Sequence, residues 1–426
     1  MTALVLSLNR RAFVSLRKYR NYRLFFAGQV VSLTGTWMHR VAQAWLVLML
    51  TRSPVAVGIL AVAQFLPFTL FGLPFGVLVD RLDARRTVIA TQAANMVLGG
   101  VLAAIVYLGV AAPWHVYVIA ALMGTVTVLD APSRQALTYR MVGPGELPNA
   151  IALNSSIFNA ARIFGPALGG VLIATAGVGA CFAINSASYL AVLAGLLMMR
   201  PGDFYPLELR EPPRLLRGMR EGLAYVRSRQ RALVVLLLVL VVSTFCFNFN
   251  VLLPVLARRT LHSGPETFGI LSAAFGGGAL VGALVTAVSG KASMRWLLVA
   301  TGGYGVGQLV LAPERTLVAA GLLLFATGLC FTIWTSNANS MLQLEAPDHL
   351  RGRIVGLYYF AFNGFGALGG LLAGWMTARS GTPAAFAFAG ALSALAAALA
   401  VPALMHGGAD RRRDPGTLEE PLDQAA

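Results

Sequence analysis

Charged residues are scarce in this chain of 426 residues: they make up 12% of it, while hydrophobic residues make up 57%. A soluble domain carries about 25% charged residues, which cover its surface. The shortage of charge therefore excludes an ordinary soluble domain and indicates a chain that lies mostly in a membrane.

Lysine and cysteine are rarer still. The lysines are Lys18 and Lys291, and every other Lys or Arg position holds arginine. The three cysteines, Cys181, Cys246 and Cys330, lie in apolar runs without the spacing of a disulfide framework or a metal site. No glycine-rich phosphate loop with a lysine is present and the five histidines are scattered, so we expect no ATPase, no other enzyme activity, no metal and no bound cofactor.

The formal net charge is nevertheless +16. In a nucleic-acid-binding protein the arginines gather on a soluble face beside groove-reading elements, whereas here they punctuate apolar segments. We therefore expect the lipid bilayer, and no nucleic acid, to be the partner of these basic residues.

Long apolar runs make up most of the chain. A membrane-spanning helix needs about 20 predominantly apolar residues. Such runs lie near residues 22–50, 54–79, 87–110, 114–138, 149–176, 178–200, 232–257, 267–289, 296–312, 316–344, 354–378 and 383–405. The sequence therefore predicts an all-α integral membrane protein with twelve transmembrane helices.

Basic residues gather in the loops on one side of this predicted bundle. The loops on the other side hold a small set: Arg52, Arg258, Arg259, Arg315 and Arg379. Because basic loops stay in the cytoplasm, both termini are predicted to be cytoplasmic. The basic N-terminus leads into a long apolar run without a cleavage site, which predicts an uncleaved first span. With a composition typical of a GC-rich bacterial gene, these features predict a multi-pass protein of the bacterial inner membrane.

The longest polar connection divides the chain into two halves. It spans residues 201–231, is rich in arginine and proline, and follows the sixth predicted span. The motif Ala-Leu-Gly-Gly at residues 167–170 recurs at 367–370, which indicates an internal repeat. We predict a first six-helix bundle over 1–200, a basic cytoplasmic linker over 201–231, a second six-helix bundle over 232–406 and a disordered tail over 407–426. Residues 218–231 could form an amphipathic helix on the inner leaflet.

Several short motifs fall in register with the predicted spans. They are Thr-Arg-Ser-Pro at 51–54, Gly-Val-Leu-Val-Asp-Arg-Leu-Asp-Ala-Arg-Arg at 76–86, Ala-Pro-Ser-Arg-Gln-Ala-Leu at 131–137, Arg-Ile-Phe-Gly-Pro at 162–166 and Arg-Gly-Arg at 351–353. Together with the two repeats, they resemble the major facilitator superfamily, and within it the bacterial exporter branch of macrolide-efflux and siderophore (enterobactin) exporters. The resemblance covers residues 19 to about 405.

The resemblance implies a secondary transporter whose two bundles, related by a pseudo-twofold repeat, rock about a central site. It implies export of a small amphipathic molecule, such as a drug, a macrolide or a siderophore, by alternating access. Because no ATPase motif is present, the energy would come from an ion gradient, and proton antiport is the inferred coupling. An importer or facilitator of the same fold is the first alternative, a membrane receptor or scaffold the second. We expect a monomer.

The loop at residues 76–86 is predicted to be a conformational latch. The resemblance assigns Asp80 to bridging neighbouring helices in the outward-facing state, with the N-terminus of the eleventh span as its partner, since helix N-termini favour carboxylates. Asp83 replaces the usual glycine and Ala84 a common arginine. The alternative is a solvated loop that only sets topology. The predicted latch comprises Gly76, Asp80, Arg81, Arg85, Arg86, Gly352 and Arg353.

The fifth span resembles the antiporter motif of exporting members, with Ala161 in place of its first glycine. Pro166 removes one helical hydrogen bond and can kink the helix, and small residues four apart allow another helix to approach closely. Ordinary helix packing is the alternative. The motif residues are Gly165, Pro166, Gly169 and Gly170.

Charges inside spans are costly, about 2.5–3.5 kcal/mol for an arginine at the helix centre, so each must be paired or hydrated. Asp130 lies in the fourth span, where it could pair with Arg162 of the fifth, with Arg134 one turn away or with the basic loop. It could form a structural salt bridge or carry the coupled proton. The predicted charge and proton-coupling network comprises Asp130, Arg134, Arg162 and His39.

Polar residues of the first span share one face of a helix, which predicts a cavity-facing stripe: Gln29, Ser32, Thr36, His39, Arg40 and Gln43. We hypothesise that Arg40 and His39 meet an anionic or polar group of the substrate, His39 being able to change charge near neutral pH. Alternatively, Arg40 reaches interfacial water. Further candidate cavity residues, about half of which could instead hold helices together, are Asn154, Asn159, Asn248, Asn250, Trp334, Asn337, Asn339 and Asn363.

Overall fold

The computed structural model describes residues 13–79, 81–206, 215–289, 292–347 and 350–406 of the chain. Asp80 and the tail over 407–426 lie outside the described residues. The part described is helical and contains no strand. Its elements are α2 (Val14–Lys18), α3 (Arg20–Thr51), α4 (Pro54–Val79), α5 (Ala84–Tyr107), α6 (Pro113–Leu197), η1 (Pro201–Asp203), α7 (Leu215–Ser228), α8 (Gln230–Val241), η2 (Val242–Cys246), α9 (Phe249–Val255), η3 (Leu256–Thr260), α10 (Pro265–Ser289), α11 (Met294–Leu311), α12 (Leu317–Glu345), α13 (Arg351–Asn363) and α14 (Gly366–His406).

Three glycines divide the two longest helices. A straight helix as long as α6 would extend about 130 Å, several times the thickness of a bilayer core. Gly143 and Gly177 interrupt α6 with φ of 68° and 80°, and Gly381 interrupts α14 with φ of 81°. Glycine reaches positive φ without steric cost. These residues therefore turn the chain back at a membrane face.

With these turns, the described helices form twelve segments in the order of the predicted spans. Counted by length and composition alone, seven helices of the described part can cross a membrane, and that count takes α6 as one helix. Divided at the glycines, the segments span residues 20–51, 54–79, 84–107, 113–142, 144–176, 178–197, 230–260, 265–289, 294–311, 317–345, 351–380 and 382–406. The prediction of an all-α membrane fold is confirmed.

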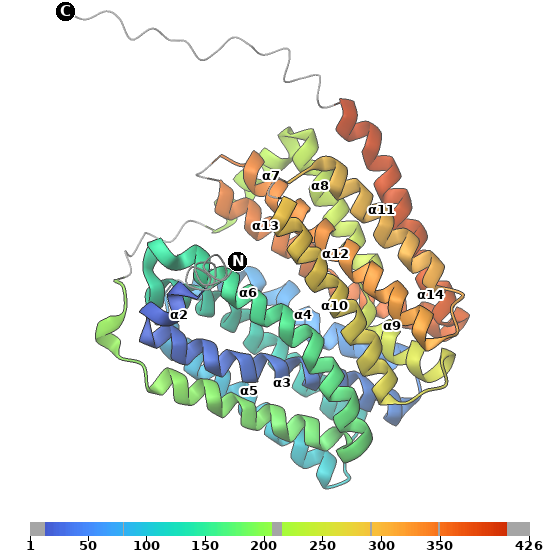
Figure 1. Cartoon of the computed structure of the whole chain (residues 1–426), viewed down its shortest axis with the longest axis horizontal. Coiled ribbons are helices and arrows are strands. Elements are labelled where there is room, and N and C mark those ends of the chain that lie inside the picture. Colours follow the sequence, from blue (N-terminus) through green and yellow to red (C-terminus); the bar gives the residue numbers. More distant parts are fainter. Residues whose placement is uncertain (1–12, 80, 207–214, 290–291, 348–349, 407–426) are drawn as a thin grey trace, which may run out of the picture.

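The helices form two groups that lie side by side (Figure 1). Helices α2 to α6, drawn in blue to green, lie together, with α3 and α5 packed on α6. Helices α8 to α14, drawn in yellow-green to red, form the other group, in which α10 packs on α12 and α11 on α14. The groups meet where α4 packs on α14 and α6 on α10. The exact bounds of the two bundles and the linker stay predictions.

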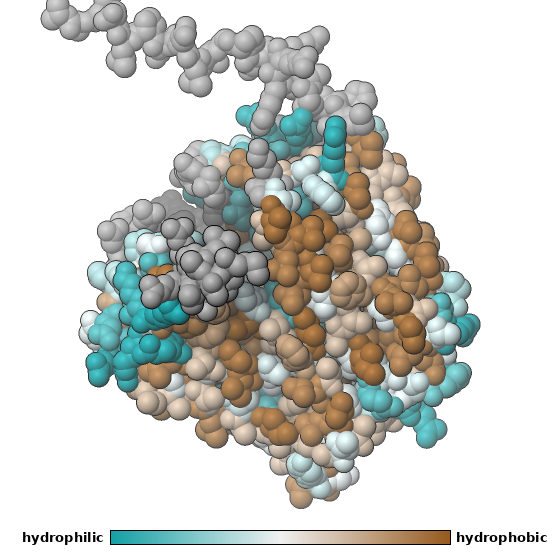
Figure 2. Space-filling model, in the orientation of Figure 1, coloured by the Kyte–Doolittle hydropathy of each residue, from teal (hydrophilic) through white to brown (hydrophobic). Residues whose placement is uncertain are grey.

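The surface between the two ends of the molecule is apolar. Figure 2 shows hydrophobic residues over the middle of the visible face, with hydrophilic residues gathered toward its edges. Large apolar side chains that project outward include Val288, which is 89% exposed, together with Leu108, Val318 and Leu344. Apolar area of this extent is stable against lipid.

Glycines bring the two groups into close contact at one end of the molecule. We call this the Arg52 end; it carries residues 51–54, 261–264 and 381. A Cβ added at Gly170 of α6 would lie 2.7 Å from the Pro265 carbonyl oxygen of α10, and one at Gly374 would lie 2.7 Å from the Pro54 oxygen. Only a residue without a side chain permits this approach. The opposite end, which carries residues 81–83, 143 and 350–353, is called the Asp83 end.

Candidate functional site

A cavity of about 520 Å³ lies between the two groups of helices. Both groups contribute to its wall, from α3, α4 and α6 on one side and from α9, α10, α12 and α13 on the other. Polar and charged side chains of the lining include Arg40, Gln64, Arg162, Asn250, Ser272, Thr335, Ser336, Asn339 and Asn363. A cavity of this size between two packed units is a typical small-molecule site.

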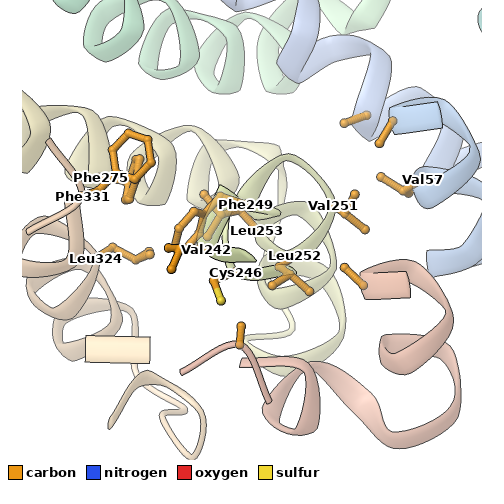
Figure 3. Packing of buried hydrophobic residues seen from close by; sticks show 14 of the residues in the cluster. Val57, Val242, Cys246, Phe249, Val251, Leu252, Leu253, Phe275, Leu324 and Phe331 are labelled. Atoms are coloured by element: carbon orange, nitrogen blue, oxygen red, sulfur yellow. The ribbon is translucent and has the colours of Figure 1, made fainter. Parts of the chain in front are cut away.

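The wall from the second group is largely aromatic. The ring of Phe247 stacks on that of Phe331 at a centroid distance of 4.4 Å, and Phe249 lies 4.5 Å from Phe275. Figure 3 shows Phe275 and Phe331 lying together, with Phe249 beside the buried residues of α9. Such rings form a rigid apolar surface that fits a flat or amphipathic ligand.

A break in the seventh segment places two of these rings in the cavity. Residues 242–246 form a π-helical turn, Phe247 leaves helical geometry and α9 begins at Phe249. In a regular helix, residues two apart point in nearly opposite directions, yet here Phe247 and Phe249 both line the cavity. The aromatic wall was absent from the sequence-based prediction. The cluster of phenylalanines over 245–249 was the signal for it.

Arg162 of α6 lies among these rings. Its guanidinium carbon is 4.9 Å from the ring centre of Phe275, 5.2 Å from Phe331 and 5.9 Å from both Phe247 and Trp37. Within the described residues, this guanidinium forms no ion pair and no hydrogen bond. The attraction between a cation and aromatic faces therefore holds it in place.

Arg40 of α3 projects into the same cavity. Its guanidinium carbon lies 5.1 Å from the ring centre of Trp37, the tryptophan that also contacts Arg162. No salt bridge to Arg40 occurs among the described residues. The Arg40 side chain is surrounded by protein but is solvent-accessible, because it projects into the cavity. The lining thus carries two cationic groups near one ring.

His39 faces away from the cavity. Its ring lies 4.8 Å from that of Phe182 in the last segment of α6, and both of its nitrogens are buried without a hydrogen-bond partner among the described residues. Neighbouring residues of a helix point about 100° apart, so Arg40 and His39 meet different surroundings. His39 is not part of the cavity lining, whereas Arg40 and Arg162 both are.

Asp130 is the centre of a separate buried network. It accepts hydrogen bonds from Thr91 Oγ1 at 2.6 Å and from Gln92 Nε2 at 2.9 Å, and it pairs with Arg134. Arg134 also donates to Gln29 of α3. Of the alternatives open for Asp130, the structure thus shows Arg134 and not Arg162. This polar network joins three helices between the cavity and the Asp83 end.

The other predicted cavity residues differ in their surroundings. Asn363, Asn250 and Asn339 line the cavity together with Arg40. The remaining residues make contacts elsewhere: Gln29 with Arg134, Thr36 with the Ser32 carbonyl, Gln43 with Gln64, Asn154 with Tyr22, Asn159 with the Ser155 carbonyl, Asn248 with the Thr244 carbonyl, Asn337 with the Ser293 amide, and Trp334 within the buried core. Their roles in transport stay predictions.

The residues of the predicted antiporter motif pack against two partners. A Cβ at Gly165 would lie 2.5 Å from the Cβ of Trp37 on α3, and one at Gly169 would lie 3.2 Å from Met38. Gly170 faces α10 of the other group, and Pro166 lines the cavity. The motif thus connects the cavity wall with the contact between the groups.

The predicted latch lies at the Asp83 end. Gly76 belongs to α4 and Gly352 to the first turn of α13, while Arg81 and Arg86 flank the start of α5. Arg85 donates to the Leu196 carbonyl at 2.8 Å, and Arg353 pairs with Glu221 of α7. Asp80 lies outside the described residues, so its bridging role stays a prediction.

Asp83 stabilises the start of α5. Its carboxylate accepts a hydrogen bond from the Arg86 amide at 2.9 Å and pairs with Arg140 at 3.0 Å. Partial burial opposes ionisation, but the two hydrogen bonds outweigh it and hold the pKa of Asp83 below its usual range. The residue that replaces the usual glycine is thus a helix cap.

Replacing Asp83 by alanine is expected to destabilise the protein by about 1 kcal/mol through loss of this cap. The carboxylate with its lowered pKa contributes stability above the usual value of about 3.9 and loses it as the pH falls through the folded value. The difference between wild type and variant should therefore shrink below that pH. Thermal unfolding in detergent at several pH values measures it, with exposed Asp203→Ala as the control. A difference that does not change with pH would contradict the capping role.

Comparisons with known proteins agree with this architecture. A family model described as transmembrane secretion effector matches residues 11–422. The chain is 30% identical over 372 residues to the multidrug efflux pump Tap of Mycobacterium tuberculosis, covering 85% of this chain and 88% of that protein. It is 24% identical over 352 residues to macrolide efflux protein A of Streptococcus pyogenes, with 80% and 86% covered.

Similarity extends to a further relative and to solved structures. The staphyloferrin A transporter of Staphylococcus aureus is 23% identical over 341 residues, with 79% of this chain and 84% of that protein covered. A bacterial homologue of the human lysosomal transporter Spinster superimposes with a TM-score of 0.67 at 14% identity, covering 93% of this chain and 97% of the other. At this identity the superposition shows a shared fold.

Proposed function

The chain belongs to the transmembrane secretion effector family within the major facilitator superfamily, and we propose that it exports a small amphipathic molecule in exchange for protons. The predicted family and the predicted exporter class are confirmed by the family match and by the relatives named as efflux pumps. The single observation that carries the proposal is the aromatic cavity between the two groups of helices. Both groups must move for a ligand at this position to change sides.

Alternating access is supported by the distribution of contacts between the groups. Close packing at Gly170 and Gly374 and the hydrogen bond from Arg259 to the Arg52 carbonyl lie at the Arg52 end. Toward the Asp83 end, the last described hydrogen bond between the groups joins Thr69 to the Gly364 carbonyl. With both termini in the cytoplasm, as the basic loops predict, this is a state closed to the outside and facing the cytoplasm.

The latch changes partners in this proposal. Here Arg353 forms an ion pair with Glu221 of α7, the helix that follows the first group of helices in the sequence. In the outward-facing state the start of α13 would approach the loop after α4, where helix N-termini favour a carboxylate. Glu221 would then hold Arg353 during one half of the cycle.

Proton coupling is assigned to the Asp130 network. Asp130, which is 6% exposed, lies inside the first group of helices. It belongs to a hydrogen-bonded network that joins α5, α6 and, through Arg134, α3. In this proposal, the coupled proton binds the Asp130 carboxylate when its contact with Arg134 opens. Movement of α3, which carries the Arg134 partner Gln29, would couple this change to the cavity.

Transport by everted membrane vesicles tests the function. Respiration acidifies the lumen of such vesicles, and accumulation of a probe in the lumen corresponds to export. We expect vesicles that contain the protein to accumulate at least one of fluorescein, rhodamine 123 and erythromycin, and a protonophore to abolish the accumulation. Vesicles from cells without the protein are the control. If the probe only equilibrates across the membrane and the protonophore has no effect, the facilitator alternative is favoured. If the probe moves only out of the lumen, an importer is favoured.

A further inference from the structure

We infer that the cavity selects an amphipathic organic anion, whose acidic group binds between Arg40 and Arg162 and whose apolar body lies on the aromatic wall. The inference rests on the proposed export function and names its substrate class. The sequence predicted a substrate contact by Arg40 and His39. The inference assigns this contact to two arginines from different helices.

The two guanidinium groups share one aromatic ring, and neither has a carboxylate partner among the described residues. Both contact the ring of Trp37, at 5.1 Å for Arg40 and 5.9 Å for Arg162, so the guanidinium carbons cannot be farther apart than the sum of these distances. The lining residues include no aspartate and no glutamate. Each guanidinium loses hydration in this largely apolar cavity. An anion between them would offset this cost for both groups.

The rings do not satisfy the hydrogen bonds of these groups. Each guanidinium has five N–H donors in its plane. Contact of Arg162 with Phe275 and Phe331 attracts its positive charge but provides no acceptor for these donors. A carboxylate, sulfonate or phosphate offers several acceptor oxygens and can be held bidentately by arginine. The donors therefore fit an oxyanion.

The surroundings also define the rest of the ligand. Phe247, Phe249 and Phe362 extend the aromatic surface next to Arg162, and apolar side chains from α3 and α4 form the facing wall. Asn250, Asn339 and Asn363 add a few amides. A small inorganic anion would leave these rings unused, while a cationic amphiphile would face two arginines. The cavity thus fits an acidic molecule with a flat or apolar body.

Two dyes with the same ring system test the charge selection. Fluorescein and rhodamine 123 share a xanthene body, but fluorescein is an anion and rhodamine 123 a cation at pH 8. Fluorescence polarisation with the purified protein in detergent measures binding of each dye. We expect wild type to bind fluorescein at least tenfold more tightly, and Arg40→Gln and Arg162→Gln each to weaken fluorescein binding at least tenfold. Preference for rhodamine 123, or unchanged fluorescein affinity in both variants, would overturn the inference.

Matched variants separate charge from folding. Arg379→Gln is the control, because Arg379 also lies over a tryptophan, Trp375, at 5.1 Å but is not part of the cavity lining. Its affinity for both dyes should match wild type. Arg40→Lys and Arg162→Lys keep the charge and should recover part of the fluorescein affinity. Lysine variants as weak as the glutamine variants, with wild-type thermal unfolding, would contradict selection by charge.

Failure of the inference and failure of the proposed function remain distinguishable. Binding is measured without a gradient, whereas export is measured in everted vesicles. Arginine-dependent fluorescein binding without proton-driven accumulation would contradict the exporter proposal and support the anion site. Proton-driven accumulation of rhodamine 123 that is unchanged by Arg40→Gln and Arg162→Gln would support export and overturn the anion site.

Discussion

Replacing Asp130 by asparagine is expected to reduce proton-driven accumulation in everted vesicles at least tenfold while changing ligand affinity by less than threefold. Asparagine has nearly the same shape and keeps an oxygen that can accept hydrogen bonds from Thr91 and Gln92. It cannot bind and release a proton or pair with the charge of Arg134. The exchange step should therefore fail although the cavity, which Asp130 does not line, stays intact.

A structural role of the same ion pair must be separated from coupling. Removing one member of a buried pair leaves an uncompensated charge and costs about 3–5 kcal/mol, whereas removing both members is often tolerated. The double variant Asp130→Asn with Arg134→Gln should thus regain the thermal stability that the single variant loses, yet remain inactive in proton-driven transport. Recovery of both stability and transport would show that the pair is structural. Asp203→Asn, at an exposed acid of η1, is the control.

Replacing Gly170 by valine is expected to lower the transport rate at least tenfold. Its Cβ would lie 2.7 Å from the Pro265 carbonyl oxygen and 3.0 Å from the Gly269 Cα. The backbones of α6 and α10 cannot move apart by this amount without opening the contact at the Arg52 end. Overpacking of this kind typically costs about 1–3 kcal/mol. The state described here should be destabilised most, since this contact belongs to it; in the proposed function it is the state that faces the cytoplasm.

The same substitution at an open position provides the control for Gly170. Gly321 lies in the interior of α12, and a Cβ added there has no atom within 4 Å. Gly321→Val should therefore transport at the wild-type rate. Transport rates and thermal unfolding of the two purified variants in proteoliposomes measure the difference. Similar losses in both variants would mean that valine disturbs these helices locally and that the contact between the groups is unimportant.

The resemblance in the sequence was already specific enough to identify the exporter class. Motifs such as Arg-Ile-Phe-Gly-Pro at 162–166 repeat features of a family whose members share one architecture, and the match over residues 11–422 confirms the family. The residues of the candidate site could be predicted less completely from the sequence than the family could. Asn363 and Arg40 were among the predicted cavity residues and line the cavity, while Asn248 and Trp334 lie in the packed second group.

The apolar runs alone determined where the chain crosses the membrane. A bilayer imposes a length of about 20 apolar residues on each helix and satisfies no backbone hydrogen bond. These constraints act within a single segment and are visible in local composition. The glycine turns follow the same principle: Gly143, Gly177 and Gly381 occur at the ends of such runs, where the chain must reverse.

Tertiary structure decided which side chains meet. Asp130 had two arginines within reach, and the packing of α5 and α3 on α6 directs it to Arg134, Thr91 and Gln92. A break between η2 and α9 brings Phe247 and Phe249 into the lining of the cavity that also holds Arg40 and Arg162. Such partners come from helices far apart in the chain. The rotation of each helix about its axis and its local breaks select these partners. The apolar composition of a lipid-embedded helix is similar on all its faces, so it predicts neither the rotation nor the breaks.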